Sequence, residues 1–178
     1  MEPTSIDLRY PIGKYVAQPY SEQLETQWLN DIKLLPLQLE QAVLNLDAHQ
    51  LHTAYREGGW TVQQLVHHIA DSHMNAYIRF KLGLTESNPI IKTYDEKAWA
   101  EMQDVENLPI NVSITLLHAL HLRWVEALID LKEDQWNRTL LHPEHNRTLT
   151  LWHFLGLYAW HGNHHVAHIN SLRRRNNW

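Results

Sequence analysis

The sequence predicts an all-α protein, an antiparallel four-helix bundle with long connections and one small β-hairpin. Apolar residues recur at steps of three and four over long segments, which is the periodicity of helices with one buried face. Between these segments the chain is rich in proline, glycine and charge, and it contains no internal repeat. A chain of 178 residues can bury a full core, so we expect one domain over residues 1–178, with residues 1–20 as an extended N-terminal arm.

The first helix is predicted to follow Ser21, whose hydroxyl makes it a suitable N-cap. An apolar row runs from Leu24 to Leu46 at helical spacing. Pro36 interrupts this row, because proline lacks the N–H that an interior helical position donates. The proline therefore either kinks one long helix or opens a second helix at its first turn.

The second long segment shows the clearest start signal in the chain. After a connection over 48–59, Thr61 and Gln64 have the spacing of a capping box. We expect a helix from there to about Leu84.

The second half of the chain alternates between irregular and helical segments. Residues 85–109 form a long excursion with at most one short helix, around 95–102, and a connection of this length often covers or lines a site. A helix is expected over 111–131, a hairpin within 139–150, and a final helix over 151–174.

Composition limits the chemistry that is open to the protein. The chain has no cysteine, which excludes disulfides, thiolate ligands and a cysteine nucleophile. Any metal must therefore be bound through histidine or carboxylate, and imidazole suits zinc or nickel. With a net charge of −5, no membrane-length apolar run and no apolar signal segment near the N-terminus, we expect a soluble cytoplasmic protein without nucleic-acid or membrane partners.

Four of the 14 histidines lie in one stretch of the last helix, WHGNHHVAHI. His161 and His165 are one turn apart, the spacing of paired metal ligands on a helix, and they fall within its apolar row. A buried neutral imidazole needs partners for both ring nitrogens, and a metal ion would supply one of them. His164 lies beside the row and is expected at the surface or behind a ligand. The role of His168 is open: the alternative to metal binding is a structural hydrogen bond at the end of the site.

A third ligand must come from another helix. The candidates are His67, His68 and His73, in the stretch VHHIADSH. Periodicity places His73 nearest the core face, His68 at its edge and His67 largely away from it. The pattern alone does not choose His68.

The chain resembles the DinB superfamily of metal-binding four-helix bundles and, within it, the YfiT-type metal-dependent hydrolases. The resemblance covers nearly the full chain and rests on the stretches RYPIGKY, YREGGWTVQQLVHHIADSHMNAYIRFKL, YDEKAW and LGLYAWHGNHHVAHI. It implies one ligand in the helix that follows the WT pair and two in the last helix, which are here His68, His161 and His165. The chain has HHVAH where many members have HHRGQ, so the role of His168 stays open.

The resemblance implies a homodimer that acts on a small molecule, and it leaves three functions open. In the first, a hydrolase, a three-histidine site with an open coordination position activates a bound water. In the second, an S-transferase, the same site activates a low-molecular-weight thiol such as bacillithiol. In the third, a non-enzymatic binding or stress-response protein, the metal is structural and His164 or His73 is a fourth ligand. Asp71 is a candidate base or hydrogen-bond partner of a ligand, and a solvated helix carboxylate is the alternative.

Overall fold

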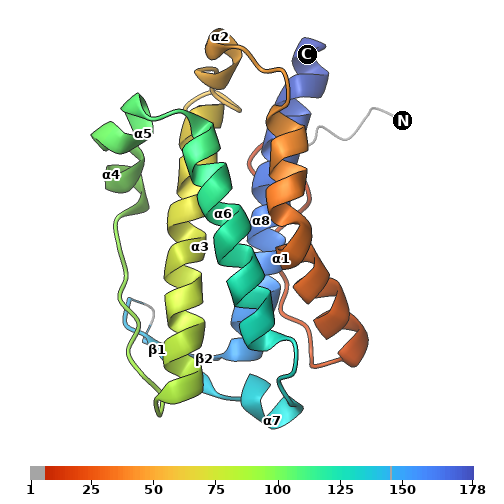
Figure 1. Cartoon of the computed structure of the whole chain (residues 1–178), viewed down its shortest axis with the longest axis vertical. Helices are drawn as coiled ribbons and strands as arrows, with labels where there is room; N and C mark the ends of the chain where they lie inside the picture. Colours follow the sequence, from red (N-terminus) through yellow and green to blue (C-terminus); the bar gives the residue numbers. More distant parts are fainter. Residues whose placement is uncertain (1–6, 145) are drawn as a thin grey trace.

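Four long helices form the four-helix bundle that the sequence predicts (Figure 1). A computed structural model describes residues 7–144 and 146–178. The long helices are α1 (Glu22–Val43), α3 (Val62–Thr85), α6 (Ile110–Leu128) and α8 (Leu151–Asn176).

The connections set the directions of the four helices (Figure 1). Helices α1 and α8 run one way along the bundle, and α3 and α6 run the other way. Each helix packs against one parallel and one antiparallel neighbour, so that α1 contacts α8 and α6, and α3 contacts α6 and α8. The long excursion after α3 returns the chain to the end where α3 began, which allows α6 to run parallel to α3.

Short elements occupy the connections between the long helices. They are α2 (Ala48–Leu51), α4 (Glu96–Ala100), α5 (Gln103–Asn107), α7 (Glu133–Trp136), β1 (Thr139–His142) and β2 (Arg147–Thr150). The two strands pair antiparallel, with Thr139 opposite Thr150, which confirms the predicted hairpin.

Two details of the connections were predicted wrongly. The excursion holds two short helices, because the chain becomes extended at Met102 before α5 begins. Asp95 caps α4, and the side chain of Val105 in α5 is buried. Residues 48–59, predicted to be a plain connection, contain the short helix α2. A capping box of Asp47 and Gln50 starts this helix.

The predicted helix starts are confirmed by their hydrogen bonds. The hydroxyl of Ser21 accepts from the backbone N–H of Leu24 at 3.4 Å. Thr61 and Gln64 form a reciprocal capping box, with distances of 3.1 Å and 3.0 Å. Of the two alternatives for Pro36, the second-helix alternative is wrong, because α1 continues through the proline to Val43.

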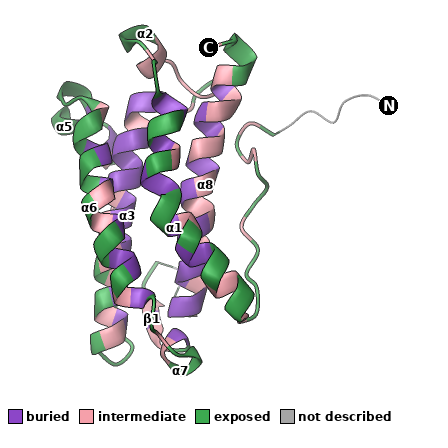
Figure 2. Cartoon of the chain, turned by 45° about the vertical axis from the view of Figure 1, so that its right-hand side comes forward, coloured by how far each residue is buried: buried purple, intermediate pink, exposed green. Residues whose placement is uncertain are grey.

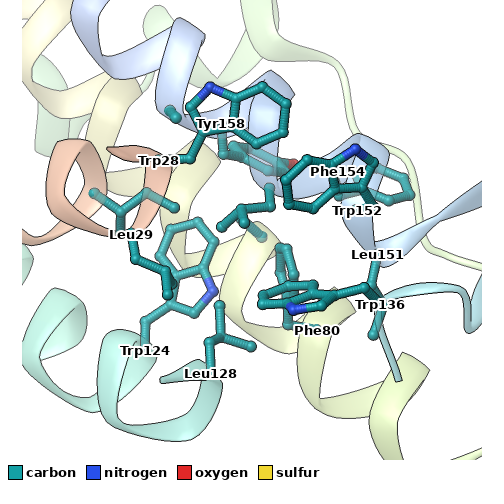
Figure 3. Close-up of a cluster of buried hydrophobic side chains, with 14 of the residues drawn as sticks. Trp28, Leu29, Phe80, Trp124, Leu128, Trp136, Leu151, Trp152, Phe154 and Tyr158 are labelled. Atoms are coloured by element: carbon teal, nitrogen blue, oxygen red, sulfur yellow. The ribbon is translucent and has the colours of Figure 1, made fainter. Parts of the chain in front are cut away.

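The buried residues of the long helices line the interior of the bundle (Figure 2), and the apolar ones among them form two regions. One region is rich in aromatic side chains, among them Trp28, Phe80, Trp124 and Trp152 (Figure 3). The other is built mainly from aliphatic residues of all four helices. Buried histidines lie between the two regions along α3, α6 and α8, so the polar layer is enclosed by apolar packing at both ends.

The N-terminal arm is fixed to α8 by hydrogen bonds, but it is not extended throughout: two hydrogen-bonded turns occupy residues 7–13, and only residues 14–20 have the turn-free course that was expected. The indole N–H groups of Trp160 and Trp152 donate to the carbonyls of Gly13 and Gln18, at 3.1 Å and 2.8 Å. The expected arm began at residue 1, and residues 1–6 lie outside the described part of the chain. None of the described helices has both the length and the apolar character that crossing a membrane requires.

Gly156 marks a close approach of α8 to its neighbours. A Cβ atom at Gly156 would lie 2.7 Å from the ring of Trp28 and 2.7 Å from the hydroxyl of Tyr15. Neither contact can relax easily, so we expect Gly156→Ala to lower the free energy of unfolding by about 1–3 kcal/mol, measured by urea denaturation. Gly83→Ala is the matched control: its Cβ would meet only leucine side-chain ends, so a loss of about 1 kcal/mol or less is expected. An equal loss in both variants would contradict this account.

Candidate metal centre

Three imidazoles from two helices converge in the polar layer of the bundle. His68 comes from α3, and His161 and His165 come from consecutive turns of α8. The Nε2 atom of His161 lies 3.2 Å from Nε2 of His68 and 3.2 Å from Nε2 of His165. All three residues offer a ligand atom within 4.8 Å of the others, so the structure brings together the three predicted ligands.

The spacing and chemistry of these nitrogens fit a divalent transition metal. Two nitrogens that each lie about 2.1 Å from a zinc ion stand about 3.4 Å apart in a tetrahedral shell. The observed 3.2 Å separations are close to that value. A set of three neutral imidazoles suits zinc or nickel, and three protein ligands leave at least one coordination position open.

Burial keeps these imidazoles uncharged. It lowers the pKa of His68 to about 4, and it lowers the pKa values of His161 and His165 well below the ordinary 6.5. The neighbouring histidines of the cluster lower the pKa of His161 and His165 further, because a second positive charge nearby would be repelled. A neutral imidazole has a free lone pair, so the cluster is ready to bind a cation near neutral pH.

Asp71 is not part of the group of three imidazoles. Burial and, to a smaller extent, the negative charge of Asp104 raise the pKa of its carboxyl to about 6. Asp104 belongs to α5, and its charge also partly offsets the burial that lowers the pKa of His67. Asp71 and His67 therefore lie on the same side of α3, the side near α5. A role for Asp71 as a base stays a prediction.

Two histidines are more deeply buried than periodicity predicted. His67, expected to point largely away from the core, is buried: its ring nitrogens lie 2.8 Å from the Ser113 hydroxyl and 3.2 Å from the Leu108 carbonyl. The start of α6 and the segment before it cover this face of α3, which the pattern of α3 alone cannot show. His164 is also buried, because it stacks on Trp160 at 4.4 Å and Tyr10 of the arm lies beside it.

His73 lies in the core, as its place in the pattern predicts. It is fully buried, and its Nε2 lies 3.2 Å from Nδ1 of His161. On its other side, its Nδ1 lies 3.0 Å from Nε2 of His121, a residue of α6. His73 therefore lies behind a candidate ligand.

A cavity of about 380 Å³ opens onto the centre at His161. Arg79 forms part of its wall and is held there, because it donates to the Tyr158 hydroxyl at 2.7 Å and to the Lys92 carbonyl at 3.1 Å. Glu96 of α4 also lines the cavity, as expected for an excursion that lines a site. Sequence reasoning missed Arg79, Glu96 and Tyr158 as candidate site residues, and the only signal was that Glu96 lies in the long excursion.

The fold and the histidine cluster together define a metal-binding helical bundle, and comparison with known proteins identifies its family. The chain matches the DinB superfamily over residues 34–169, and it belongs to this family. Two relatives, from Bacillus cereus (strain 03BB102) and Bacillus thuringiensis subsp. konkukian (strain 97-27), bear names that begin "Putative metal-dependent hydrolase". Each is 53% identical over 173 residues, which is 97% of this chain and 99% of the relative.

A solved structure supports the same assignment. YfiT from Bacillus subtilis, described as a probable metal-dependent hydrolase with an unusual four-helix bundle topology, superposes with a TM-score of 0.94. It is 47% identical in sequence, and the match covers 97% of this chain and 99% of YfiT. The resemblance noted in the sequence is thereby confirmed at the level of family and fold.

The buried histidines make the stability of the metal-free protein depend on pH. In the unfolded chain a histidine takes up its proton as the pH falls through about 6.5, whereas His68 and His121 stay neutral in the fold until about pH 4. The unfolded state then binds more protons, so the free energy of unfolding falls as the pH drops between these values, by up to about 1.4 kcal/mol per pH unit for each such group.

We expect the urea midpoint of the metal-free protein to fall steeply between about pH 7 and about pH 5. His121→Gln should flatten this dependence, because it removes one of the buried imidazoles. His118→Gln is the control on the same helix, at a side chain that is 38% exposed. A midpoint that does not change with pH in this range would show that the imidazoles are not buried as described.

Proposed function

We propose that the protein is a metal-dependent hydrolase in which His68, His161 and His165 bind one divalent ion, zinc or nickel. The observation that carries the proposal is the convergence of three Nε2 atoms beside a cavity that reaches one of them, His161. A substrate in this cavity would lie next to His161, one of the residues that would hold the ion. The names of the relatives and the description of YfiT support hydrolysis as the reaction.

The residues around the centre have separate tasks in this proposal. When bound, the ion supplies a Lewis acid that polarises a carbonyl and lowers the pKa of water. The three imidazoles hold it without adding charge, so the site keeps the full positive charge of the ion. The apolar regions at both ends of the polar layer exclude bulk water, which strengthens electrostatic interactions at the centre.

The cavity wall gives an indication of the substrates to test. Arg79 and Arg147 both line it, and Glu96 is the acidic residue among the lining residues. The guanidinium of Arg79 is fixed by its bonds to Tyr158 and to the main chain, so its positive charge is positioned before a substrate arrives. Esters and amides that carry a negative group are therefore the first compounds to assay, with neutral analogues beside them.

Metal content provides the first test. We expect about one zinc or nickel ion per chain, measured by elemental analysis after dialysis, because the three imidazoles form one site. His68→Ala, His161→Ala and His165→Ala should each lose most of the bound metal and the hydrolysis of model esters with it. His118→Ala, on the outer side of α6, should keep both. A protein that binds no metal under these conditions would contradict the proposal.

A second assay separates the reactions that such a site can support. Metal-loaded protein should hydrolyse model esters or amides faster than the His165→Ala variant does. Conjugation of a low-molecular-weight thiol to an electrophile, without hydrolysis, would identify an S-transferase and refute the hydrolase. No rate above the variant in either assay would indicate that the metal is structural. Asp71→Asn belongs in the same series, since slower hydrolysis at full metal content is expected if Asp71 is the base.

A further inference from the structure

We propose that two relays of histidines, each ending on a main-chain carbonyl, fix the tautomers of His161 and His165 so that both present the Nε2 lone pair to the metal. The inference rests on the proposed metal centre and extends it to residues that do not contact the ion. His73 and His121 form the first relay, and His168 forms the second. These are positioning residues, because they act through the ligands.

The first relay ends on a carbonyl of α1 that is left open by Pro36. In an α-helix each N–H donates to the carbonyl four residues before it, and proline has no N–H. The carbonyl that loses its donor at Pro36 is that of Ile32. The imidazole Nδ1 of His121, from the neighbouring helix α6, is hydrogen-bonded to this same carbonyl oxygen. The break in one helix thus provides a hydrogen-bond acceptor for a side chain of the next helix.

The position of each proton along the first relay follows from this carbonyl. A carbonyl oxygen only accepts, so Nδ1 of His121 must carry the proton, and in the neutral ring Nε2 is then an acceptor. Nδ1 of His73 lies 3.0 Å from that acceptor and must donate to it, so Nε2 of His73 accepts in turn. Nδ1 of His161, at 3.2 Å, donates to His73. Nε2 of His161 therefore keeps its lone pair, and this is the atom that faces the other two ligands.

The second relay is shorter and ends in the N-terminal arm. The carbonyl of Arg9 lies 3.3 Å from Nε2 of His168, which must therefore donate. Nδ1 of His168 then accepts, and it lies 3.4 Å from Nδ1 of His165. His165 donates from Nδ1 and keeps the Nε2 lone pair for the metal. His168 is held in this orientation by Tyr55, whose ring stacks on it at 4.0 Å.

Because the rings of both relays are buried, their hydrogen bonds fix one tautomer for each ring. His73 is 0% exposed, His121 1% and His168 2%, so water has little access to their ring nitrogens. A charged ring is strongly disfavoured where water is excluded, so each of these rings is neutral with one donor and one acceptor. A neutral ring in the wrong tautomer would set two N–H groups or two lone pairs against each other, and an unpaired buried polar group is costly.

The relay also decides between two groups of histidines that could hold a metal. His164, His165 and His168 form a second group with ligand atoms within 4.8 Å of one another. If Nε2 of His165 binds the ion of the first group, ligation in the second group would require Nδ1 of His165, which the second relay uses as a donor. The relay therefore predicts one metal ion per chain, with His168 outside the metal shell.

The direct test reads the tautomers in the wild-type protein. Long-range ¹H–¹⁵N correlation spectra of protein with ¹⁵N-labelled histidine, loaded with diamagnetic zinc, report which ring nitrogen carries the proton. We expect protons on Nδ1 of His73 and His121 and on Nε2 of His168. A proton on Nε2 of His73 or on Nδ1 of His168 would overturn the corresponding relay. This readout does not depend on the folding of any variant.

Zinc affinity measures the effect of the relays. His73→Phe and His168→Phe keep a ring of similar size but remove the acceptor for a ligand N–H. Each is expected to weaken zinc binding about 10–100-fold, measured by competition with a chelator, because this is the usual effect of losing a hydrogen bond to a ligating histidine. His118→Phe is the control and should bind zinc as the wild type does. Wild-type affinity in both relay variants would refute the proposal.

The outcomes separate this inference from the proposed function. If the protein binds one zinc ion but His73 or His168 has the other tautomer, the relay fails and the metal site stands. If two zinc ions bind per chain, with His165 shared between them, the second relay fails. If zinc does not bind at all, the proposed function fails together with the inference.

Discussion

An uncharged imidazole inside a helical bundle has one donor and one acceptor, and each must find a partner where water is excluded. The described part of the chain places eight such rings in one polar layer between two apolar regions, seven of them buried and that of His161 partly buried. Three of the hydrogen-bond paths in this layer end on main-chain carbonyls, at Ile32 in α1, Leu108 before α6 and Arg9 in the arm. The proposed metal centre depends on this network, since three lone pairs facing one another repel unless a cation or a proton lies between them.

The bundle could be predicted from the sequence because apolar periodicity and capping residues are local signals. The pair His161 and His165 could be predicted for the same reason, since both lie in the apolar row of one helix. The choice of His68 needed the family resemblance, because the periodicity of α3 describes its own faces and not which helix packs on each of them. His67 shows the limit of such reasoning: it is buried because Ser113 and Leu108, more than forty residues away, cover it.

The partners behind the candidate ligands could not be predicted from spacing at all. His121 contacts His73 because α6 runs parallel to α3, and that direction follows from the path of the long excursion. The carbonyl of Arg9 contacts His168 only because the arm lies along α8. Indole N–H groups of α8 donate to carbonyls of the arm and hold it there. Contacts of this kind depend on the arrangement of elements in space, and a single sequence carries no local signal for them.

Pro36 also has a consequence for the assembly of the bundle. Apolar side chains alone allow a helix to slide along its neighbours at small cost, because leucine can replace leucine one turn away. Each residue of slip moves a carbonyl by about 1.5 Å and turns it by about 100°. In a regular helix each carbonyl is directed at the N–H four residues later, so the carbonyl of Ile32, which Pro36 leaves without that donor, is the one that α1 offers to His121. The proline thus sets the longitudinal position of α1 relative to α6. Packings in which the two helices are shifted along each other would lose the hydrogen bond from His121 to α1.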